Sequence, residues 1–588
     1  MNYAFSSRMQ PGFQLKLEGW RARFLLFALG AGFALLLGRA FYLQGLNSNF
    51  LQAKGEARFT RVVEMPASRG PVLDRNGVPL AISTPVESIW ISPSEVEITP
   101  AQVGALAHAL NISRKELDDK FDDDGKNFVW LKRQISPEQA ARVMALKIPG
   151  LFQQREYRRY YPQGEVMAHV IGFTGVDDNG QEGIELSQQK WLTGSPGSRR
   201  VIKDRKGRIV EDIENLKAPR EGKGLTLSID QHLQYLAHRE LKAAVAANKA
   251  KGGAAVVLDA RSGEVLALVN QPDYNPNNRA AMTGKQTRNR SVTDVFEPGS
   301  TFKPFAVAAA LESGLVTPKT VFQTGTTLAI GGRSIGDAHP HASLSVAEII
   351  QKSSNIGTAK IALQMPAEQL WKIYSELGFG APTDTGFPGE ASGKLRAWKG
   401  WRPIEPATMA YGYGLNVSLL QLARAYTLFS NEGQLLPVTF IKRESAIIGK
   451  QIFTPKTAHT MSAMLETVVQ AGGTAIKGQV PGYRMAGKTG TARKLVNGKY
   501  VNDAHTAVFV GYGPVSDARF VIAVSIDEPT AGKYAGGDIA APVFSAIMAG
   551  ALRQFSIAPD AQIREAATTP LLGKPATLAP GNALQERG

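Results

Sequence analysis

The sequence predicts a mixed α/β (α+β) protein with two globular domains and one N-terminal membrane anchor. Three observations lead to this class. The chain has 588 residues, which is too long for one ordinary domain. An uncharged apolar run begins at Phe24, close to the N-terminus. Strand-like runs occur in the first part of the chain and again near its end, and a series of helical runs lies between them.

The composition is that of a folded protein with a basic surface. The chain is 43% hydrophobic and 20% charged, with a net charge of +16. The basic residues are spread along the chain without a zinc-finger, RNP or basic-zipper pattern, so we expect no nucleic-acid partner. Cysteine is absent, which excludes a thiol nucleophile, thiolate metal sites and disulfides.

The N-terminus predicts a single retained membrane span over residues 24–43. Residues 1–23 form a basic tail with one acidic residue. The apolar run continues past Arg39, whose long side chain can reach the interface, and its roughly 20 residues can cross a ~30 Å hydrocarbon core. The basic flank predicts a cytoplasmic N-terminus. A cleaved signal peptide is the alternative, and the apolar residues 41–43 favour the anchor.

Residues 44–222 predict a β-rich domain without catalytic features. Glu87–Ile91 has the pattern of a strand, and an acidic helix is expected over 116–124. Asn76-Gly77 is a strong hairpin signal. A charged turn is expected at 204–208.

A boundary at Gly222-Lys223-Gly224 precedes the second domain, expected over residues 223–556. A strand and then a helix ending near Asn248 lead into a hairpin of buried strands. The tail at 557–588 is rich in Ala, Pro and Thr and is expected to be flexible. The remaining predicted elements are strands at 254–259, 265–269, 506–512 and 520–526, and helices at 305–312, 346–352, 419–430 and about 539–555.

Ser300 and Lys303 are the candidate nucleophile and base. Ser300 follows a Gly-led turn, and on a helix the two side chains share one face. A serine hydroxyl needs a base within hydrogen-bond reach, and a partly desolvated amine can serve as that base. By itself the spacing is weak, because most such pairs are solvated helix surface.

Two further motifs follow in the order that one acyl-transfer family uses. Ser353-Ser354-Asn355 follows a short apolar helix and predicts a polar loop. Lys488-Thr489-Gly490-Thr491 predicts a strand, on which Gly490 would let a substrate backbone lie close. Each motif alone is typical of a turn or strand end, but three in order make chance a poor explanation.

From about the membrane segment to about residue 556, the chain resembles class B penicillin-binding proteins, the peptidoglycan DD-transpeptidases that β-lactams acylate. It is most similar to the division-specific septal group, penicillin-binding protein 3. The resemblance implies a penicillin-binding, serine β-lactamase-like transpeptidase domain on a non-catalytic pedestal of the dimerisation type. Besides the three motifs, the resemblance rests on Arg288-Asn289-Arg290, on Thr293-Asp294-Val295-Phe296-Glu297-Pro298-Gly299-Ser300-Thr301 and on Ala410-Tyr411-Gly412-Tyr413-Gly414.

The resemblance implies a serine acyl-enzyme mechanism that needs no metal or cofactor. Lys303 would activate Ser300, while Ser353 and Lys488 would pass the proton to the leaving amine. Asn355 completes the catalytic set. The resemblance also implies that Thr489 and Thr491 bind the substrate carboxylate, that Gly490 lies beside it, and that Tyr413 walls the groove. Ser354 departs from the motif as often quoted, which has aspartate there.

The resemblance also implies a location and partners. The enzyme would sit in the bacterial inner membrane with its catalytic domain in the periplasm. It would act on stem peptides and be acylated by β-lactams. No Glu-Asp-x-x-Phe box of a glycosyltransferase is found, so a membrane glycan polymerase and other divisome proteins are the expected partners. In the pedestal, Arg69 and Glu185 are candidates for a buried ion network.

Two other functions remain as alternatives. A serine β-lactamase would need a Glu-x-x-Leu-Asn motif between the second and third motifs, and Glu405-Pro406-Ala407-Thr408-Met409 does not fit it. A non-enzymatic scaffold or β-lactam sensor would be free to lose a motif, yet all three are intact.

Two departures from septal enzymes occur near the motifs. Phe302 stands where valine is common, and Ala535 stands where a second aromatic residue often follows Tyr534. If both border the pocket, β-lactam acylation is expected to be weaker. The alternative is that Phe302 faces the core and changes nothing.

Overall fold

The computed structural model describes residues 18–561 except 48–53, 55–59, 94–95, 122–127, 204–208 and 497–498. The chain forms two compact units. The first contains residues 1–68, 85–157 and 194–221, and the second contains 69–84, 158–193 and 222–588. The domain boundaries expected at 43, 222 and 556 stay predictions. Most of the expected basic and C-terminal tails and the turn at 204–208 lie outside the described residues.

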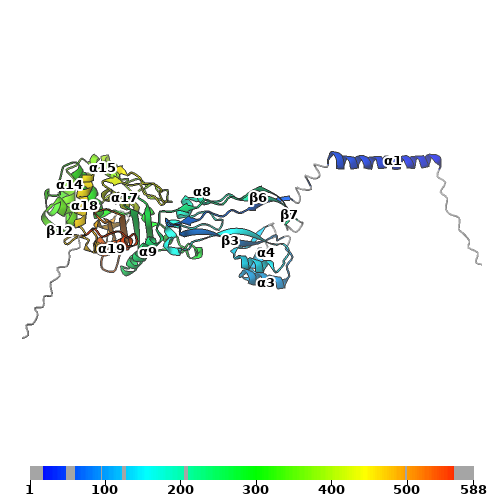
Figure 1. Ribbon diagram of the computed structural model, residues 1–588, viewed down its shortest axis with the longest axis horizontal. Coiled ribbons are helices and arrows are strands. Elements are labelled where there is room, and N and C mark those ends of the chain that lie inside the picture. The colour runs from blue at the N-terminus through cyan, green and yellow to red at the C-terminus, as the bar shows by residue number, and fades with distance from the viewer. Residues whose placement is uncertain are drawn as a thin grey trace, which may run out of the picture. The chain divides into compact units, whose positions relative to one another are not determined.

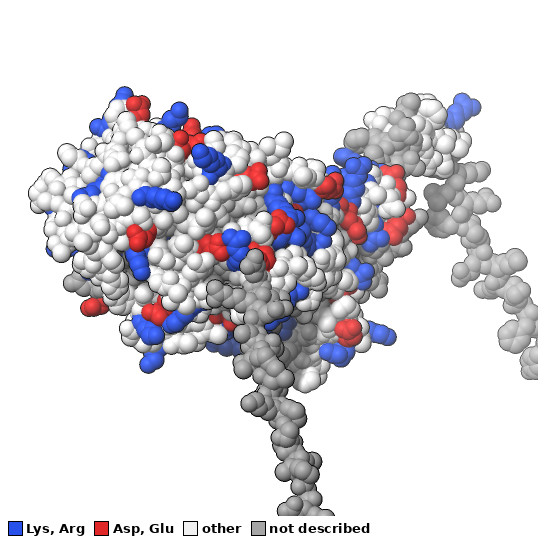
Figure 2. All heavy atoms as spheres, turned by 60° about the vertical axis from the view of Figure 1, so that its left-hand side comes forward, with Lys and Arg blue, Asp and Glu red and all other residues white. Residues whose placement is uncertain are grey.

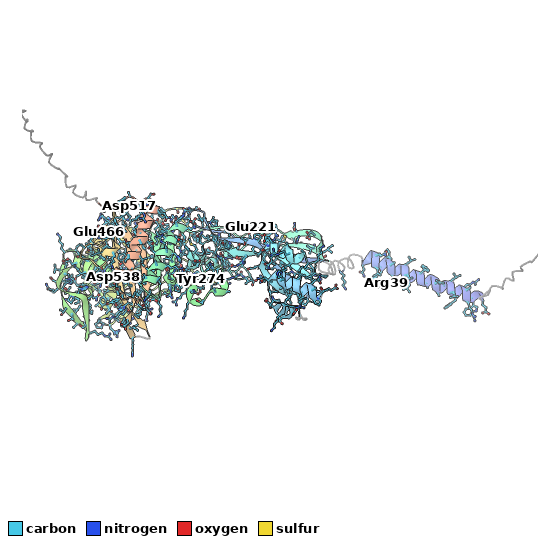
Figure 3. The ribbon with its side chains drawn as sticks, turned by 90° about the horizontal axis from the view of Figure 1, so that it is seen from below. Arg39, Glu221, Tyr274, Glu466, Asp517 and Asp538 are labelled. Atoms are coloured by element: carbon cyan, nitrogen blue, oxygen red, sulfur yellow. The ribbon has the colours of Figure 1, made fainter. Side chains whose placement is uncertain are left out.

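Helix α1 (Gly19–Phe41) and the π-helical turn after it (Tyr42–Leu46) form one apolar segment. Between Gly19 and Gly45, a stretch of 18 residues has a mean hydropathy of 2.0 and none of it is buried, so the length and composition of the segment suffice to cross a membrane. Arg39 projects from this helix, and its guanidinium lies 5.6 Å from the Tyr42 ring (Figure 3). A snorkelling arginine near one end of the apolar segment agrees with the predicted span.

The first unit contains two antiparallel sheet regions. β6 (Gly197–Lys203) lies between β1 (Thr60–Met65) and β7 (Ile209–Lys217). In the other region, β3 (Pro79–Ile91) pairs with β4 (Val129–Ile135) and β5 (Leu151–Tyr160), and the first unit holds β3 from residue 85 onward and β5 up to residue 157. The strand predicted at 87–91 is part of β3. The helices packed on it are α3 (Pro100–Leu110), α4 (Arg114–Phe121) and α5 (Pro137–Met144). The predicted acidic helix is α4, which begins two residues early.

Asn76-Gly77 forms the predicted turn, which joins β2 (Val72–Leu73) to β3. Asp74 fixes this turn, because its Oδ1 accepts hydrogen bonds of 2.8 Å from the backbone N–H groups of Asn76 and Val78. Gly77 has φ +86°, a conformation that glycine adopts without strain.

The predicted ion network is present in the second unit and includes a third residue. Glu185 is fully buried and accepts from Arg69 Nε at 2.5 Å and from Arg159 Nε at 2.6 Å. Arg159 also donates to the backbone oxygen of Gly70. Two guanidinium groups therefore share one buried carboxylate, an arrangement in which removal of one partner leaves an uncompensated charge.

The second unit is built around a five-stranded antiparallel sheet in the order β10-β9-β17-β16-β15. Its strands are β9 (Gly252–Asp259), β10 (Val265–Gln271), β15 (Ala486–Val496), β16 (Lys499–Gly513) and β17 (Phe520–Asp527). Helices α9 (Gln231–Ala247) and α19 (Gly536–Gln554) lie side by side on one face, and α17 (Leu419–Ser430) packs on the other (Figure 1). Because both faces are covered, nearly all of β9, β10 and β17 is apolar and buried.

The predicted helices of the second unit are confirmed, with small shifts at their ends. They are α12 (Lys303–Glu312), α13 (Val346–Lys352), α17 and α19. The hairpin of β11 (Val321–Ile330) and β12 (Arg333–Ser345) was not predicted. On the face in Figure 2, acidic side chains lie among the basic ones, as expected of a solvated surface.

Candidate active site

Ser300 lies on a 3₁₀ turn (Gly299–Phe302) that leads directly into α12. Gly299 has φ +54° and donates its N–H to the oxygen of Gly412 at 3.1 Å. A Cβ on Gly412 would lie 2.1 Å from the oxygen of Gly299, so both positions require glycine. Residues three apart eclipse one another on a 3₁₀ turn, and this places the side chains of Ser300 and Lys303 together.

Two of the predicted side chains contact the amine of Lys303, and a third, that of Lys488, contacts one of these two. Its Nζ lies 2.7 Å from Ser300 Oγ and 3.1 Å from Ser353 Oγ. It also donates to the backbone oxygen of Ser353 at 2.7 Å. Ser353 ends α13 in the left-handed conformation, with φ +61°. Lys488 Nζ lies 2.9 Å from Ser353 Oγ, so a continuous chain of polar atoms runs from Ser300 to Lys488.

Both lysines are fully buried, and this changes their protonation. Burial, together with the nearby Lys488, lowers the pKa of Lys303 well below its usual range, although Asp337 opposes the shift. Burial lowers the pKa of Lys488 to about 7. A neutral Lys303 amine can accept a proton from Ser300, and Lys488 can exchange a proton near neutral pH.

Asp337 on β12 organises the second motif and was missed by the sequence analysis. Its carboxylate accepts from the Ser354 hydroxyl at 2.5 Å and from the backbone N–H groups of Asn355 and Ile356. These groups open α14 (Asn355–Ala362). Asn355 donates its side-chain amide to the oxygen of Gly336 at 2.9 Å and has no hydrogen bond to Ser300 or either lysine within the described chain. Serine in place of aspartate at 354 was the one signal in the sequence.

Strand β15 carries the third motif along one edge of the sheet. A Cβ on Gly490 would lie 2.8 Å from the oxygen of Pro298, so only glycine lets the strand approach the turn of Ser300. Thr489 Oγ1 lies 2.8 Å from Thr474 Oγ1. Thr491 Oγ1 accepts from the N–H of Gly536 at 3.1 Å. The strand of the third motif and the turn of Ser300 are therefore neighbours.

Tyr413 lies in a group of aromatic residues close to Glu297, three residues before Ser300. Its ring centroid is 5.8 Å from that of Tyr411 and 5.9 Å from that of Tyr500. The Tyr500 hydroxyl donates to Glu297 at 3.1 Å, and Gly414 N–H donates to the same carboxyl at 2.8 Å. Burial raises the pKa of Glu297. Glu297 and Tyr500 were not predicted as part of this site.

Phe302 faces the core, which was the alternative reading of this departure. Its buried ring lies 4.7 Å from the ring of Tyr374, 4.8 Å from that of Phe379 and 5.2 Å from that of Phe305. Ala535 immediately precedes α19 and is next to Gly536, the partner of Thr491. Of the two departures, only Ala535 adjoins the third motif.

Two family models of penicillin-binding proteins match the chain. The family model of the penicillin-binding protein transpeptidase domain matches residues 253–549, and that of the penicillin-binding protein dimerisation domain matches residues 64–227. The chain belongs to the penicillin-binding protein transpeptidase family. As a class B penicillin-binding protein similar to penicillin-binding protein 3, it is an enzyme with a transpeptidase domain and a dimerisation domain.

Individual penicillin-binding proteins match most of the chain. The probable peptidoglycan D,D-transpeptidase PenA of Neisseria meningitidis is 45% identical over 551 residues, which are 93% of this chain and 95% of PenA. The peptidoglycan D,D-transpeptidase FtsI of Escherichia coli is 44% identical over 549 residues, 92% of this chain and 93% of FtsI. The transpeptidase domain of Burkholderia pseudomallei penicillin-binding protein 3 is 48% identical with a TM-score of 0.53, and the match covers 57% of this chain and 98% of that domain.

Proposed function

We propose that this protein cross-links the stem peptides of septal peptidoglycan during cell division, as a serine-type D,D-transpeptidase. The observation that carries the proposal is the chain of short contacts from Ser300 through Lys303 and Ser353 to Lys488. The high identity to PenA and FtsI over nearly the whole chain supports it.

The reaction begins when neutral Lys303 takes the proton of Ser300 and the serine oxygen attacks the carbonyl carbon of a D-Ala-D-Ala bond. Backbone N–H groups of Ser300 and Thr491 stabilise the oxyanion, at about 3 to 4 kcal/mol per donor in comparable sites. Ser353 and Lys488 deliver a proton to the departing D-alanine nitrogen, and the C–N bond breaks. The amine of a second stem peptide then attacks the ester and releases Ser300.

The substrate lies along β15, whose outer edge is unpaired within the described chain. Thr489 and Thr491 bind the terminal carboxylate, and Gly490 lets the peptide backbone approach. Asn355 holds the peptide amide, and Tyr413 forms one wall of the groove. β-Lactams react at the same serine, because their strained amide occupies the position of the D-Ala-D-Ala bond.

Covalent labelling with a fluorescent penicillin tests the nucleophile. Ser300→Ala removes one oxygen and should abolish labelling, while the thermal unfolding midpoint stays near that of the wild type. Ser445→Ala, which changes an exposed serine, is the matched control and should label normally. Labelling that persists in folded Ser300→Ala would exclude Ser300 as the nucleophile.

In the cell, α1 holds the protein in the inner membrane with residues 1–23 in the cytoplasm. Residues 44–222 serve as a pedestal, and residues 223–556 perform the reaction in the periplasm. A separate membrane glycan polymerase and other divisome proteins supply the glycan strands and place the enzyme at the septum. The exposed apolar segment, its basic flank and the missing glycosyltransferase box support this arrangement.

The cysteine-free sequence allows a direct test of topology. A membrane-impermeant maleimide, applied to cells with a permeabilised outer membrane, should label Ser445→Cys, whereas Glu18→Cys should react only after lysis. The opposite pattern would contradict the orientation. Glycan synthesis from lipid-linked precursor by the purified protein alone would contradict the need for a separate polymerase.

A further inference from the structure

The second unit contains a polar cavity of about 310 Å³ that the proposed reaction does not use. It lies where the chain leaves β10, and Tyr274 marks it in Figure 3. Strand β10 is at the opposite edge of the sheet from β15, so about 19 Å of sheet, four strand spacings, separates the two edges. The residues that line the cavity are Glu165, Asp273, Tyr274, Asn275, Asn278, Ala281, Met282 and Gln286.

Asp273 lines this cavity, and hydrogen bonds to one of its oxygens hold its carboxylate in place. Lys242 Nζ at 2.9 Å, Gln271 Nε2 at 3.0 Å and His238 Nε2 at 2.7 Å all bond to its Oδ2. Within the described chain no bond reaches Oδ1. Partial burial opposes ionisation, but these three hydrogen bonds outweigh it and hold the pKa of Asp273 well below its usual range. The group is therefore an ionised acceptor whose charge is already balanced by Lys242.

Three carboxamides in the cavity wall have unused donors in the described chain. The side-chain oxygen of Asn275 accepts from the N–H of Asn277, and that of Gln286 accepts from the Thr283 hydroxyl. Among the described residues, neither NH₂ group has a hydrogen-bond acceptor. Within the described part of the chain, the side chain of Asn278 makes no hydrogen bond. A free carboxamide offers two N–H donors in a fixed plane. Carboxylate acceptors and amide donors therefore lie around one cavity.

The loop that carries these amides is held in place, so the cavity is formed before any ligand binds. Asn277 exchanges two hydrogen bonds with the backbone of Tyr161, at 2.9 and 3.0 Å. His169 Nε2 lies 2.8 Å from the backbone oxygen of Gln286. Burial lowers the pKa of His169 to about 4, so the ring stays neutral and donates this hydrogen bond at physiological pH. A preformed cavity spares the ligand the ordering of the loop.

We propose that this cavity binds a sugar ring of the N-acetylhexosamine class. Each sugar hydroxyl both donates and accepts, and an N-acetyl group adds one N–H and one carbonyl, which matches the alternation of carboxylates and carboxamides. A divalent cation fits less well, because Lys242 already neutralises the charge of Asp273. Glu165 is then the one carboxylate of the cavity without an ion-pair partner among the described residues. The inference rests on the proposed function in one respect: the sugar would belong to the glycan of the polymer whose peptides are cross-linked.

Saturation-transfer NMR on the full-length protein in detergent, with the N-acetylglucosamine tetramer as probe, tests the proposal. We expect the wild type to give transfer to the sugar. Asn278→Ala and Gln286→Ala should each raise the Kd at least tenfold. Gln364→Ala, an exposed carboxamide outside the cavity, is the matched control and should stay within twofold.

Two further measurements separate saccharide binding in the cavity from acylation at Ser300. Saccharide binding should be the same before and after acylation by penicillin, and penicillin labelling should be the same in Asn278→Ala as in the wild type. Absence of transfer, or transfer that survives both cavity variants, would overturn the proposal. Because labelling of Ser300 is measured separately, failure of the saccharide site is distinguishable from failure of the transpeptidase assignment.

Discussion

Two buried lysines meet at the hydroxyl of Ser353, and their burial links activity to stability. The fold lowers the pKa of each lysine. The proposed proton transfers need both lysines with a lowered pKa. A lysine that must lose its proton on folding makes the folded state less stable at neutral pH. The site therefore keeps a destabilising feature that the proposed reaction requires.

The pH dependence of unfolding follows from Lys488. Its pKa is about 7 in the folded protein and 10.5 when unfolded, so between these values the unfolded state binds more protons. The free energy of unfolding should therefore rise with pH across this window, by up to about 1.4 kcal/mol per pH unit. In Lys488→Met this contribution is absent, and the variant should be more stable than the wild type at pH 7.

Urea unfolding at pH 7, 8 and 9 measures the effect. Lys319→Met, which removes an exposed lysine, should keep the slope of the wild type. If the free energy of unfolding of Lys488→Met rose with pH as steeply as that of the wild type, burial of Lys488 would not be the cause of the pH dependence.

Asp337→Asn should slow acylation and shift its pH profile. The carboxylate fixes Ser354 and the first turn of α14, and loss of such a cap typically costs about 1 kcal/mol of stability. It also favours the charged form of Lys303, so its removal lowers the pKa of Lys303 further. We expect the rate constant for penicillin acylation to fall about tenfold and its acid limb to move to lower pH.

Acylation rates from pH 5 to 9 test this prediction for Asp337. Asp517→Asn changes an exposed carboxylate and should match the wild type. If the acid limb of the pH profile is the same in Asp337→Asn as in the wild type, Asp337 affects acylation only by positioning α14 and not through the pKa of Lys303.

At the scale of single elements, local sequence determined some structures and distant contacts determined others. The helix predicted at 419–430 has those bounds because a capping box of Ser418 and Gln421 opens it and its core-facing side is continuously apolar. The hairpin of β11 and β12 was missed because most of its residues are exposed and its apolar pattern is weak. It is held by Ile335, which packs with Ile356 of α14.

The same reason explains which site residues could be predicted. Ser300, Lys303, Ser353 and Lys488 belong to short motifs with fixed spacing. Asp337 belongs to no motif, and its role arises only when the hairpin packs beside α14.

The close approach of β15 to the nucleophile turn predicts the effect of a single methyl group. Gly490→Ala would place a Cβ 2.8 Å from the oxygen of Pro298 and 2.9 Å from Thr301 Cγ2. The strand must move away from Ser300, so acylation by penicillin should drop at least tenfold while the protein stays folded. Gly400→Ala has open space around its Cβ and should label normally. Full labelling of Gly490→Ala would show that the strand tolerates the shift.

At the scale of the whole molecule, Glu185 connects segments of the second unit that are far apart in the sequence. Glu185→Gln leaves two buried guanidinium groups without their carboxylate, and breaking such a network typically costs about 3 to 5 kcal/mol. The midpoint of urea unfolding should fall accordingly. Glu444→Gln changes an exposed carboxyl and should have little effect. An equal shift of the unfolding midpoint in both variants would show that the network does not stabilise the fold more than an exposed carboxyl does.

The interleaving of the two units was beyond the sequence analysis. The sequence analysis took residues 44–222 as one domain, yet 69–84 and 158–193 belong to the unit that carries the candidate active site. Their membership is decided by pairing with residues far along the chain, such as β2 with β8 (Leu225–Thr226). No local pattern records a partner at such a distance.

This interleaving has a consequence for how the protein is made. Val72, Leu80 and Ala81 belong to the same apolar core as the central sheet, whose last strand ends at Asp527. At 5 to 20 residues per second, a ribosome needs about 20 to 90 s to travel from residue 84 to that strand. During this interval the early segments have no core to join. The newborn chain must therefore be shielded from aggregation, by chaperones or by the export machinery, until nearly the whole of it has been synthesised.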